Sequence, residues 1–185
     1  MEDKLAKRTW VEINPEALKK NLTICRESAP GAAVMAVVKA DAYGHGLTET
    51  VKALESQIDA FGVATLKEAI TIISLISEKK TVMILGALLP DERETAIMQD
   101  IHVTVSSLQE AQEFSEIGKS NDKEVKVHLV LDTGMGRLGF SDNNFARNCQ
   151  EIKALDYISI SGVATHFPCS DIDDEFTNQQ IKTFN

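Results

Sequence analysis

A lysine at the end of an apolar run is the first residue of this sequence whose placement suggests chemistry. Lys39 follows such a run in VMAVVKADAYGHG, residues 34–46. If the run is a β-strand, its two-residue period puts Met35, Val37 and Lys39 on one face. If that face lines a pocket, the lysine is desolvated, which lowers its pKa and favours the neutral amine that condenses with aldehydes or acts as a base. The sequence therefore predicts Schiff-base chemistry at Lys39.

The segment after Lys39 argues against the ordinary alternative, a lysine whose ammonium group extends from a strand end into solvent. The loop places Tyr43 four residues after the lysine and puts glycines on both sides of His45. Glycines permit a tight turn, and the carboxyl ends of barrel strands are where barrel enzymes have their active sites. Lys39 is therefore predicted to face an active site, with His45 as a loop residue only.

A glycine-punctuated loop carries the second candidate, Arg137, in HLVLDTGMGRLGF at residues 128–140. Taken alone, such a loop is equally consistent with a phosphate-binding loop or a simple tight turn. An arginine fixed at this place has the geometry to donate hydrogen bonds to a cofactor phenolate or a substrate carboxylate. Arg137 is therefore a candidate binding residue.

A histidine lies in the third segment, SGVATHFPCSD at residues 161–171. The strand period predicts that Ile160, Gly162, Ala164 and His166 share one face, so that small residues line the interior and the histidine lies at the carboxyl end. An interior histidine is as often structural as functional. The assignment of His166 therefore depends on the other two segments.

These segments resemble the alanine racemases. The string VVKADAYGHG resembles the pyridoxal 5′-phosphate (PLP) binding signature of that family, and RTWVEINPEALKKN at residues 8–21 resembles its amino terminus. DTGMGRLG and THFPCSD resemble two further family segments, and FTNQQIKTF resembles the helix that follows them. The resemblance implies a PLP-dependent (β/α)8 barrel enzyme that interconverts L-alanine and D-alanine and supplies D-alanine for peptidoglycan.

The resemblance also implies a role for each candidate residue. Lys39 would bind PLP covalently and act as the base on the D-alanine side, and Tyr43 would help to hold the cofactor phosphate. Arg137 would contact the PLP 3′-oxygen and the substrate carboxylate. His166 would hydrogen-bond an arginine that contacts the pyridine nitrogen. One position departs from the family pattern, because Val130 stands where the family often has a lysine that positions the arginine.

Racemisation needs two acid–base groups on opposite faces of the substrate. In the family the second group is a tyrosine from the carboxyl-terminal β domain of a second subunit, which implies a homodimer. The tyrosines of this chain are Tyr43, on the cofactor loop, and Tyr157, which precedes the last predicted strand. Neither suits the second role, so we expect the 185-residue chain alone to be inactive as a racemase.

Six short apolar runs are predicted to form the strands that position these residues. Several carry small or apolar side chains on both faces, which is typical of parallel strands covered on both sides. Two capping-box pairs, Thr65 with Glu68 and Ser107 with Glu110, mark places where a strand passes into a helix. The predicted strands are residues 32–38, 60–64, 81–86, 101–105, 125–131 and 158–164.

Strand and helix alternate about every 20 to 30 residues, which matches the repeating unit of a (β/α)8 barrel. Such barrels have eight strands in typically about 250 residues, so six units indicate an incomplete barrel, and we expect the family's β domain to be absent from this chain. Residues 14–185 would form the PLP-binding domain, starting with a helix over about 15–28 that Asn14 and Pro15 begin. Residues 1–13 would be a leading segment in which RTWVEI adds a strand.

Composition excludes several partner classes. The chain has a formal net charge of −9, which disfavours nucleic acid and anionic lipid because both require a basic face. Its three cysteines, Cys25, Cys149 and Cys169, have neither a disulfide framework nor the spacing of a zinc site, so no metal is expected. No apolar stretch has the length of a signal peptide core or a membrane span. We expect a cytoplasmic protein with reduced thiols.

Three alternatives remain open at this point. A racemase of serine or broader specificity would share these motifs. An aldolase-type barrel would use Lys39 for a Schiff base with its substrate and would need no cofactor. A non-catalytic PLP-binding barrel protein would share the fold, although the loops of such proteins do not carry DTGMGRLG. The absorbance of bound PLP would separate the aldolase from the others.

Overall fold

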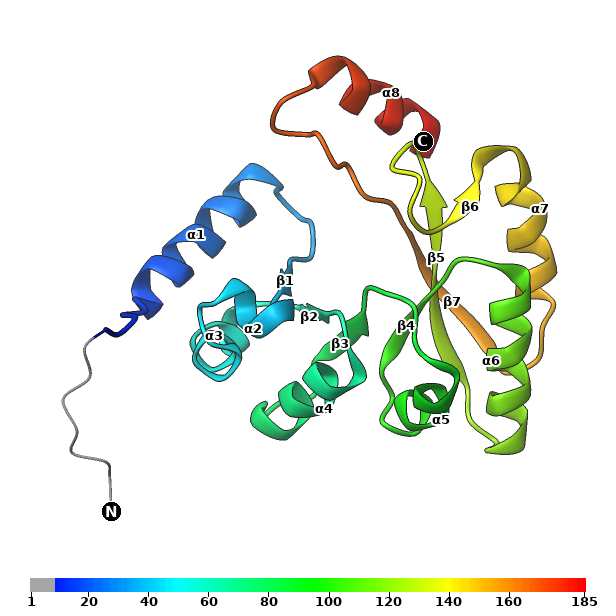
Figure 1. The fold of residues 1–185 in the computed structure, drawn as a ribbon, viewed down its shortest axis with the longest axis horizontal. Coiled ribbons are helices and arrows are strands. Elements are labelled where there is room, and N and C mark those ends of the chain that lie inside the picture. The colour runs from blue at the N-terminus through cyan, green and yellow to red at the C-terminus, as the bar shows by residue number, and fades with distance from the viewer. Residues whose placement is uncertain (1–8) are drawn as a thin grey trace.

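Parallel strands form the centre of the molecule, and helices α4 to α7 pack along their outer side (Figure 1). The structure, a computed structural model, describes residues 9–185. Its strands are β1 (Met35–Val37), β2 (Ala60–Val63), β3 (Thr81–Ile84), β4 (His102–Val105), β5 (Val125–Asp132), β6 (Phe140–Ser141) and β7 (Ile158–Ala164). The six predicted strands are confirmed, and β6 is a two-residue addition that no pattern in the sequence indicated.

The helices alternate with the strands as predicted. They are α1 (Pro15–Ser28), α2 (Lys39–Tyr43), α3 (Leu47–Leu54), a 3₁₀ turn (Glu55–Gln57), α4 (Leu66–Leu75), α5 (Pro90–Met98), α6 (Leu108–Ser120), α7 (Asp142–Lys153) and α8 (Asp174–Phe184). The start of α1 is confirmed, because Asn14 Oδ1 accepts from the backbone N–H groups of Glu16 and Ala17 at 3.0 and 3.2 Å. None of these helices within residues 9–185 combines the length and apolar character that crossing a membrane requires.

The two predicted capping boxes differ in detail. At α4 the box is complete, since Thr65 accepts from the Glu68 backbone and the Glu68 carboxylate accepts from the Thr65 backbone. At α6 the Ser107 hydroxyl accepts from the Glu110 backbone at 3.1 Å, but the Glu110 carboxylate accepts from Ser106 at 2.9 Å. The second cap is therefore present, with its return bond displaced by one residue.

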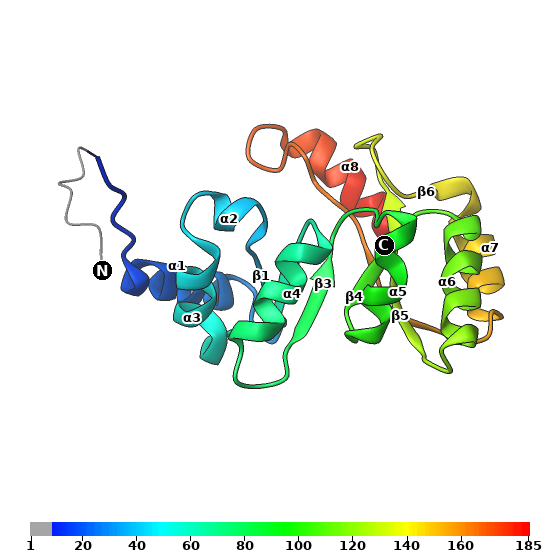
Figure 2. The same ribbon diagram turned by 60° about the horizontal axis from the view of Figure 1, so that its bottom comes forward.

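The strands follow the chain in the order β1, β2, β3, β4, β5, β7, and every neighbouring pair is parallel. The short β6 pairs with the end of β5. Parallel strands in sequential order form the wall of a (β/α) barrel, and the carboxyl ends of all these strands lie at one rim of the barrel. In Figure 2, α2 and α8 lie along the same upper edge of the molecule. The turn that carries Lys39 and Tyr43 and the helix that follows the His166 segment therefore lie along that edge.

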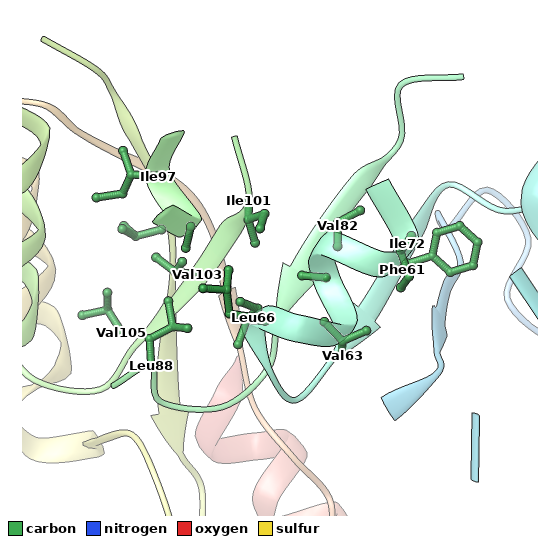
Figure 3. Packing of buried hydrophobic residues seen from close by; sticks show 14 of the residues in the cluster. Phe61, Val63, Leu66, Ile72, Val82, Leu88, Ile97, Ile101, Val103 and Val105 are labelled. Carbon is green, nitrogen blue, oxygen red and sulfur yellow. The ribbon is translucent and has the colours of Figure 1, made fainter. Parts of the chain in front are cut away.

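The two faces of the sheet differ in composition. The outer face is apolar and packs on the helices, and Figure 3 shows part of this core, with Phe61, Val63, Val82, Val103 and Val105 from the strands and Leu66, Ile72 and Ile97 from the helices. Along β5 every second residue is buried and the others are half-buried. Those half-buried side chains face the barrel interior, and they are Lys126, His128, Val130 and Asp132.

A β-bulge corrects the predicted face of β7. Val127 pairs with Ile160 but the next residue, His128, pairs with Gly162, so the register shifts between them. Ile160 therefore shares the outer face with Val127 and packs against the core, whereas Gly162 and Ala164, which pair with His128 and Val130, face the interior. The prediction that Ile160 lines the interior was wrong, because a two-residue period breaks wherever a strand carries an unpaired extra residue.

The predicted extra strand at residues 8–13 is not found where the structure can test it. Residue 8 lies outside the described residues, and residues 9–13 have no strand conformation. Trp10 and Val11 are 68% and 77% exposed. A β-branched, apolar segment is a strand only when a neighbouring strand supplies its hydrogen bonds, and the described strands pair with one another instead.

Candidate active site

One cavity at the carboxyl ends of the strands gathers the four residues that the sequence singled out. Its volume is about 390 Å³, which is within the usual range for small-molecule sites. The candidate residues in its wall are Lys39, Tyr43, Arg137 and His166. Apolar and small side chains form most of the rest, namely Val37, Met83, Leu85, Val130, Leu131, Met135, Leu138 and Ala164, together with Thr104, Asp132 and Thr165.

Lys39 stands at the start of a left-handed turn. The strand ends at Val37, and residues 40–43 have φ angles of 52°, 54°, 51° and 55°, so the segment labelled α2 is not a right-handed helix. This conformation is unfavourable by roughly 1–2 kcal/mol for each residue that has a side chain. Four such residues in sequence persist only when surrounding contacts hold them.

Hydrogen bonds hold this turn at both of its ends. At its start the Ala40 N–H donates to Glu68 Oε1 at 2.7 Å, and at its end the Leu47 N–H donates to Asp41 Oδ1 at 2.7 Å. Within the turn the Ala42 N–H donates to the carbonyl of Val38 at 2.9 Å. The backbone that follows Lys39 is therefore fixed at both ends of the turn, and His45 lies in the loop after it, as predicted.

The loop that carries Arg137 is built around Asp132. The Asp132 carboxylate accepts from the backbone N–H groups of Gly134 and Gly136, at distances of 2.9 to 3.0 Å, and these bonds lower the pKa of the carboxyl group. At Gly139 the φ is +123°, and a side chain there would meet the Val130 carbonyl oxygen at 2.8 Å. The loop thus closes tightly on the end of β5 while the Arg137 side chain remains exposed.

A buried glutamine joins this loop to the segment that carries His166. Gln180 on α8 is fully buried, and its Nε2 donates to Thr133 Oγ1 at 3.1 Å and to the His166 carbonyl at 3.3 Å. The hydroxyls of Thr133 and Thr165 are 2.8 Å apart. The family resemblance covers this helix, but the role of Gln180 could not be predicted, since a bond across 47 positions leaves no local pattern.

A histidine pair that no pattern in the sequence predicts lies on the inner face. His102 Nδ1 and His128 Nε2 are 3.0 Å apart, on adjacent strands β4 and β5. Burial lowers the pKa of both rings, and at His102 the neighbouring His128 and Lys126 lower it further. Lys126 itself pairs with Asp100 at 2.8 Å. The pair does not belong to the cavity wall described above.

The side chains of the cavity define a class of ligand. Lys39 offers an amine, and Arg137 a guanidinium whose positive charge suits a phenolate, carboxylate or phosphate. Tyr43 and His166 offer hydrogen-bonding groups, and Asp132 is already occupied by its own loop. The set fits an anionic aldehyde together with a small anionic substrate, which agrees with PLP and an amino acid.

Comparison with known proteins identifies the family that the sequence motifs resemble. A family profile described as "Alanine racemase, N-terminal domain" matches residues 13–185. An alanine racemase of Methylacidiphilum infernorum is 37% identical over 175 residues, which are 94% of this chain and 45% of that protein. The chain therefore spans about half the length of the relatives that it matches.

Solved structures extend the match to three dimensions. An alanine racemase of Clostridium difficile 630 has a TM-score of 0.90 at 34% identity, over 98% of this chain and 48% of that one. A histidine racemase from Leuconostoc mesenteroides subsp. sake has a TM-score of 0.86 at 27% identity, over 93% of this chain and 47% of that one. With its parallel sheet, its cavity and this profile match, the chain belongs to the alanine racemase family and corresponds to the family's amino-terminal, barrel-like domain.

Proposed function

We propose that this chain is the lysine-bearing part of a PLP-dependent alanine racemase. The observation that carries the proposal is that Lys39, Tyr43, Arg137 and His166, taken from three separate segments of the sequence, line one cavity. The names of the similar proteins support alanine as the substrate.

In this proposal each of the four residues has a separate role in the cavity. PLP, when bound, would supply an electron sink for the negative charge left when the α-proton is removed. The Lys39 amine would hold the cofactor through its aldehyde, and the exposed Tyr43 would contact its phosphate. Arg137 would donate to the cofactor phenolate and to the substrate carboxylate, where a charge-assisted bond is stronger than a neutral one. His166 would orient its neighbours at the rim.

Lys39 would move the α-proton on one face only. The other tyrosine of this chain, Tyr157, lies before β7 with its hydroxyl bonded to Asp122 at 3.2 Å, away from the cavity wall. Tyr43 shares the Lys39 turn. We therefore propose that the 185-residue chain alone exchanges the proton but does not invert the substrate, and that a tyrosine of a partner subunit completes the reaction.

Assays on the same protein also test two other functions. The fold likeness to a histidine racemase favours a racemase of different or broader specificity, including serine, as the second candidate. A panel of L-amino acids separates these two. A non-catalytic PLP-binding barrel would bind the cofactor and racemise none of them.

The physiological setting is part of the proposal. An alanine racemase would act in the cytoplasm as a homodimer and supply D-alanine for peptidoglycan. The names of the relatives give the racemase activity alone, so this setting rests on the family resemblance of the sequence. Sedimentation of the complete protein tests the dimer, since a homodimer has twice the mass of one chain.

Borohydride trapping tests the cofactor assignment. The Lys39 amine condenses with the PLP aldehyde and releases water, and borohydride then delivers a hydride to the carbon of the new carbon–nitrogen double bond while its nitrogen takes a proton from water. Peptide mapping should place the label on Lys39. Lys126 is the internal control, because it also faces the barrel interior but is paired with Asp100 at 2.8 Å. A label on Lys126, or on any lysine other than Lys39, would contradict the proposal.

A further inference from the structure

Glu68 makes one contact that helix capping does not require. Its Oε2 accepts from the backbone N–H groups of Ala64 and Thr65 at 2.9 and 3.1 Å, where β2 passes into α4. Its Oε1 accepts from the N–H of Ala40 at 2.7 Å, which belongs to the preceding strand's loop. One carboxylate therefore joins the carboxyl ends of two neighbouring strands.

The residue that it reaches is the one directly after Lys39. Ala40 is also the first of four consecutive residues in the left-handed conformation, which is unfavourable for residues with a side chain. The bond from Ala40 to Glu68 fixes the peptide group between Lys39 and the turn. It therefore limits the directions in which the Lys39 side chain can leave the backbone.

Two other glutamates occupy the same helical position without such a contact. Glu92 in α5 accepts from the backbone of Leu89 at 3.0 Å, and Glu110 in α6 accepts from the backbone of Ser106 at 2.9 Å. Within the part of the chain that the structure describes, each of these backbone bonds stays inside the glutamate's own strand-to-helix junction. The reach of Glu68 to Ala40 is therefore a feature of the lysine loop and not of helix starts in this fold.

We propose that Glu68 is a positioning residue for Lys39, because its carboxylate ties the left-handed turn to the end of β2 and so fixes where the lysine amine lies in the cavity. The inference rests on the proposed role of Lys39. Both carboxylate oxygens accept hydrogen bonds, on opposite sides. An amide of the same shape would turn an NH₂ donor toward either Ala40 or the end of β2, where the backbone also donates. The contacts on both sides of Glu68 therefore require a charged carboxylate, and an amide of the same shape does not replace it.

The test compares Glu68→Gln with the matched control Glu92→Gln. PLP is added to each protein, the product is trapped with borohydride over time, and the labelled peptide is quantified. Glu68→Gln should slow labelling of Lys39 about tenfold or more, since a charge-assisted bond is lost and a donor is left unpaired. Glu92→Gln should leave the rate within about twofold, because its bond lies outside the lysine loop.

A second control separates positioning from stability. Thr65→Ala removes the hydroxyl that accepts from the Glu68 N–H at 3.3 Å, and so weakens the start of α4, but leaves the carboxylate bonds in place. Thr65→Ala should lower the denaturation midpoint and still label Lys39 at the wild-type rate. Hydrogen exchange should show the Ala40 amide protected in the wild type and in Thr65→Ala, and less protected in Glu68→Gln, where a neutral amide either accepts more weakly or turns its donor toward Ala40.

The outcomes distinguish this inference from the proposed function. Wild-type protein that labels at Lys39, with a folded Glu68→Gln variant that labels equally fast, overturns the role of Glu68 and leaves the function intact. Wild-type protein that does not label at Lys39 overturns the proposed function. If Glu68→Gln does not fold, the wild type still decides, because an Ala40 amide that exchanges at the rate of an unstructured peptide overturns the inference.

Discussion

At the scale of single residues, Lys39, Tyr43, Arg137 and His166 line one cavity, and hydrogen bonds between distant positions hold the segments that carry them. Lys39, Arg137 and His166 each follow an apolar strand, and carboxyl ends of parallel strands share a rim, so their convergence in one cavity could be predicted. The contact of Glu68 with Ala40 spans 28 positions and that of Gln180 with Thr133 spans 47. Such contacts depend on how the elements pack, and no spacing in the sequence reports them.

Arg137 gives the first residue-scale prediction. Arg137→Ala in the complete enzyme should lower kcat/KM by about 10- to 100-fold, because removing one charge-assisted hydrogen bond costs about 1.5–3 kcal/mol. Steady-state kinetics with alanine measures it. Arg147→Ala is the control, since Arg147 is an exposed residue of α7 that pairs with Glu151 at 2.7 Å. Activity of Arg137→Ala equal to that of the control would remove Arg137 from the site.

The histidine pair gives a pH prediction. Both folded-state pKa values lie below the ordinary value of 6.5, so the unfolded chain binds protons more readily as the pH falls below 6.5. Above pH 6.5 the pair should therefore leave the free energy of unfolding unchanged with pH. Below pH 6.5 the free energy of unfolding should decrease as the pH is lowered. Asp100, with a pKa lowered to about 2, acts only at much lower pH.

Chemical denaturation at about pH 7.5 and about pH 5.5 measures this loss. Replacing both residues, as His102→Gln and His128→Gln, should reduce the difference in stability between the two pH values. Glu110, whose pKa is raised by burial, changes stability in the opposite sense, but it is present in both proteins and cancels. An unchanged pH difference in the double variant would show that the pair is not responsible.

At the scale of elements, the strands and helix starts followed from local patterns, and the exceptions have physical causes. Side-chain preferences over a few neighbouring residues determine the end of β1, the caps of α1 and α4 and the alternation along β5. The bulge that turns Ile160 outward and the left-handed residues 40–43 are conformations that neighbouring elements impose. Neither leaves a periodic signal, and both adjoin the site, where local rules are expected to fail.

The loop after β5 gives an element-scale prediction. Gly139→Ala should destabilise the protein by about 3 kcal/mol or more, because the new side chain meets backbone atoms and the φ is positive. Gly44→Ala is the matched control: its φ is also positive, at +86°, but nothing lies within 4 Å of the added carbon. It should cost only about 1 kcal/mol. Urea denaturation compares the two, and equal losses would contradict the tight closure on Val130.

At the scale of the whole molecule, the regular alternation of apolar strands with helices made the barrel class predictable. The inner face is where composition departs from a simple core, with Lys126, His128 and Val130 along one strand. The outermost strands of the sheet, β1 and β7, each pair with one described neighbour. Val37 on β1 is 40% exposed and Val163 on β7 is 42% exposed. The relatives are about twice as long as this chain.

The most direct test of the central claim follows the α-proton of alanine in deuterium oxide with PLP present. The complete enzyme should convert L-alanine into D-alanine that carries deuterium at the α-carbon, and Lys39→Ala should abolish this. The 185-residue chain alone should exchange the α-proton of D-alanine without inverting it. Racemisation that survives Lys39→Ala, or racemisation by the chain alone at about 1 per second or faster, would contradict the account.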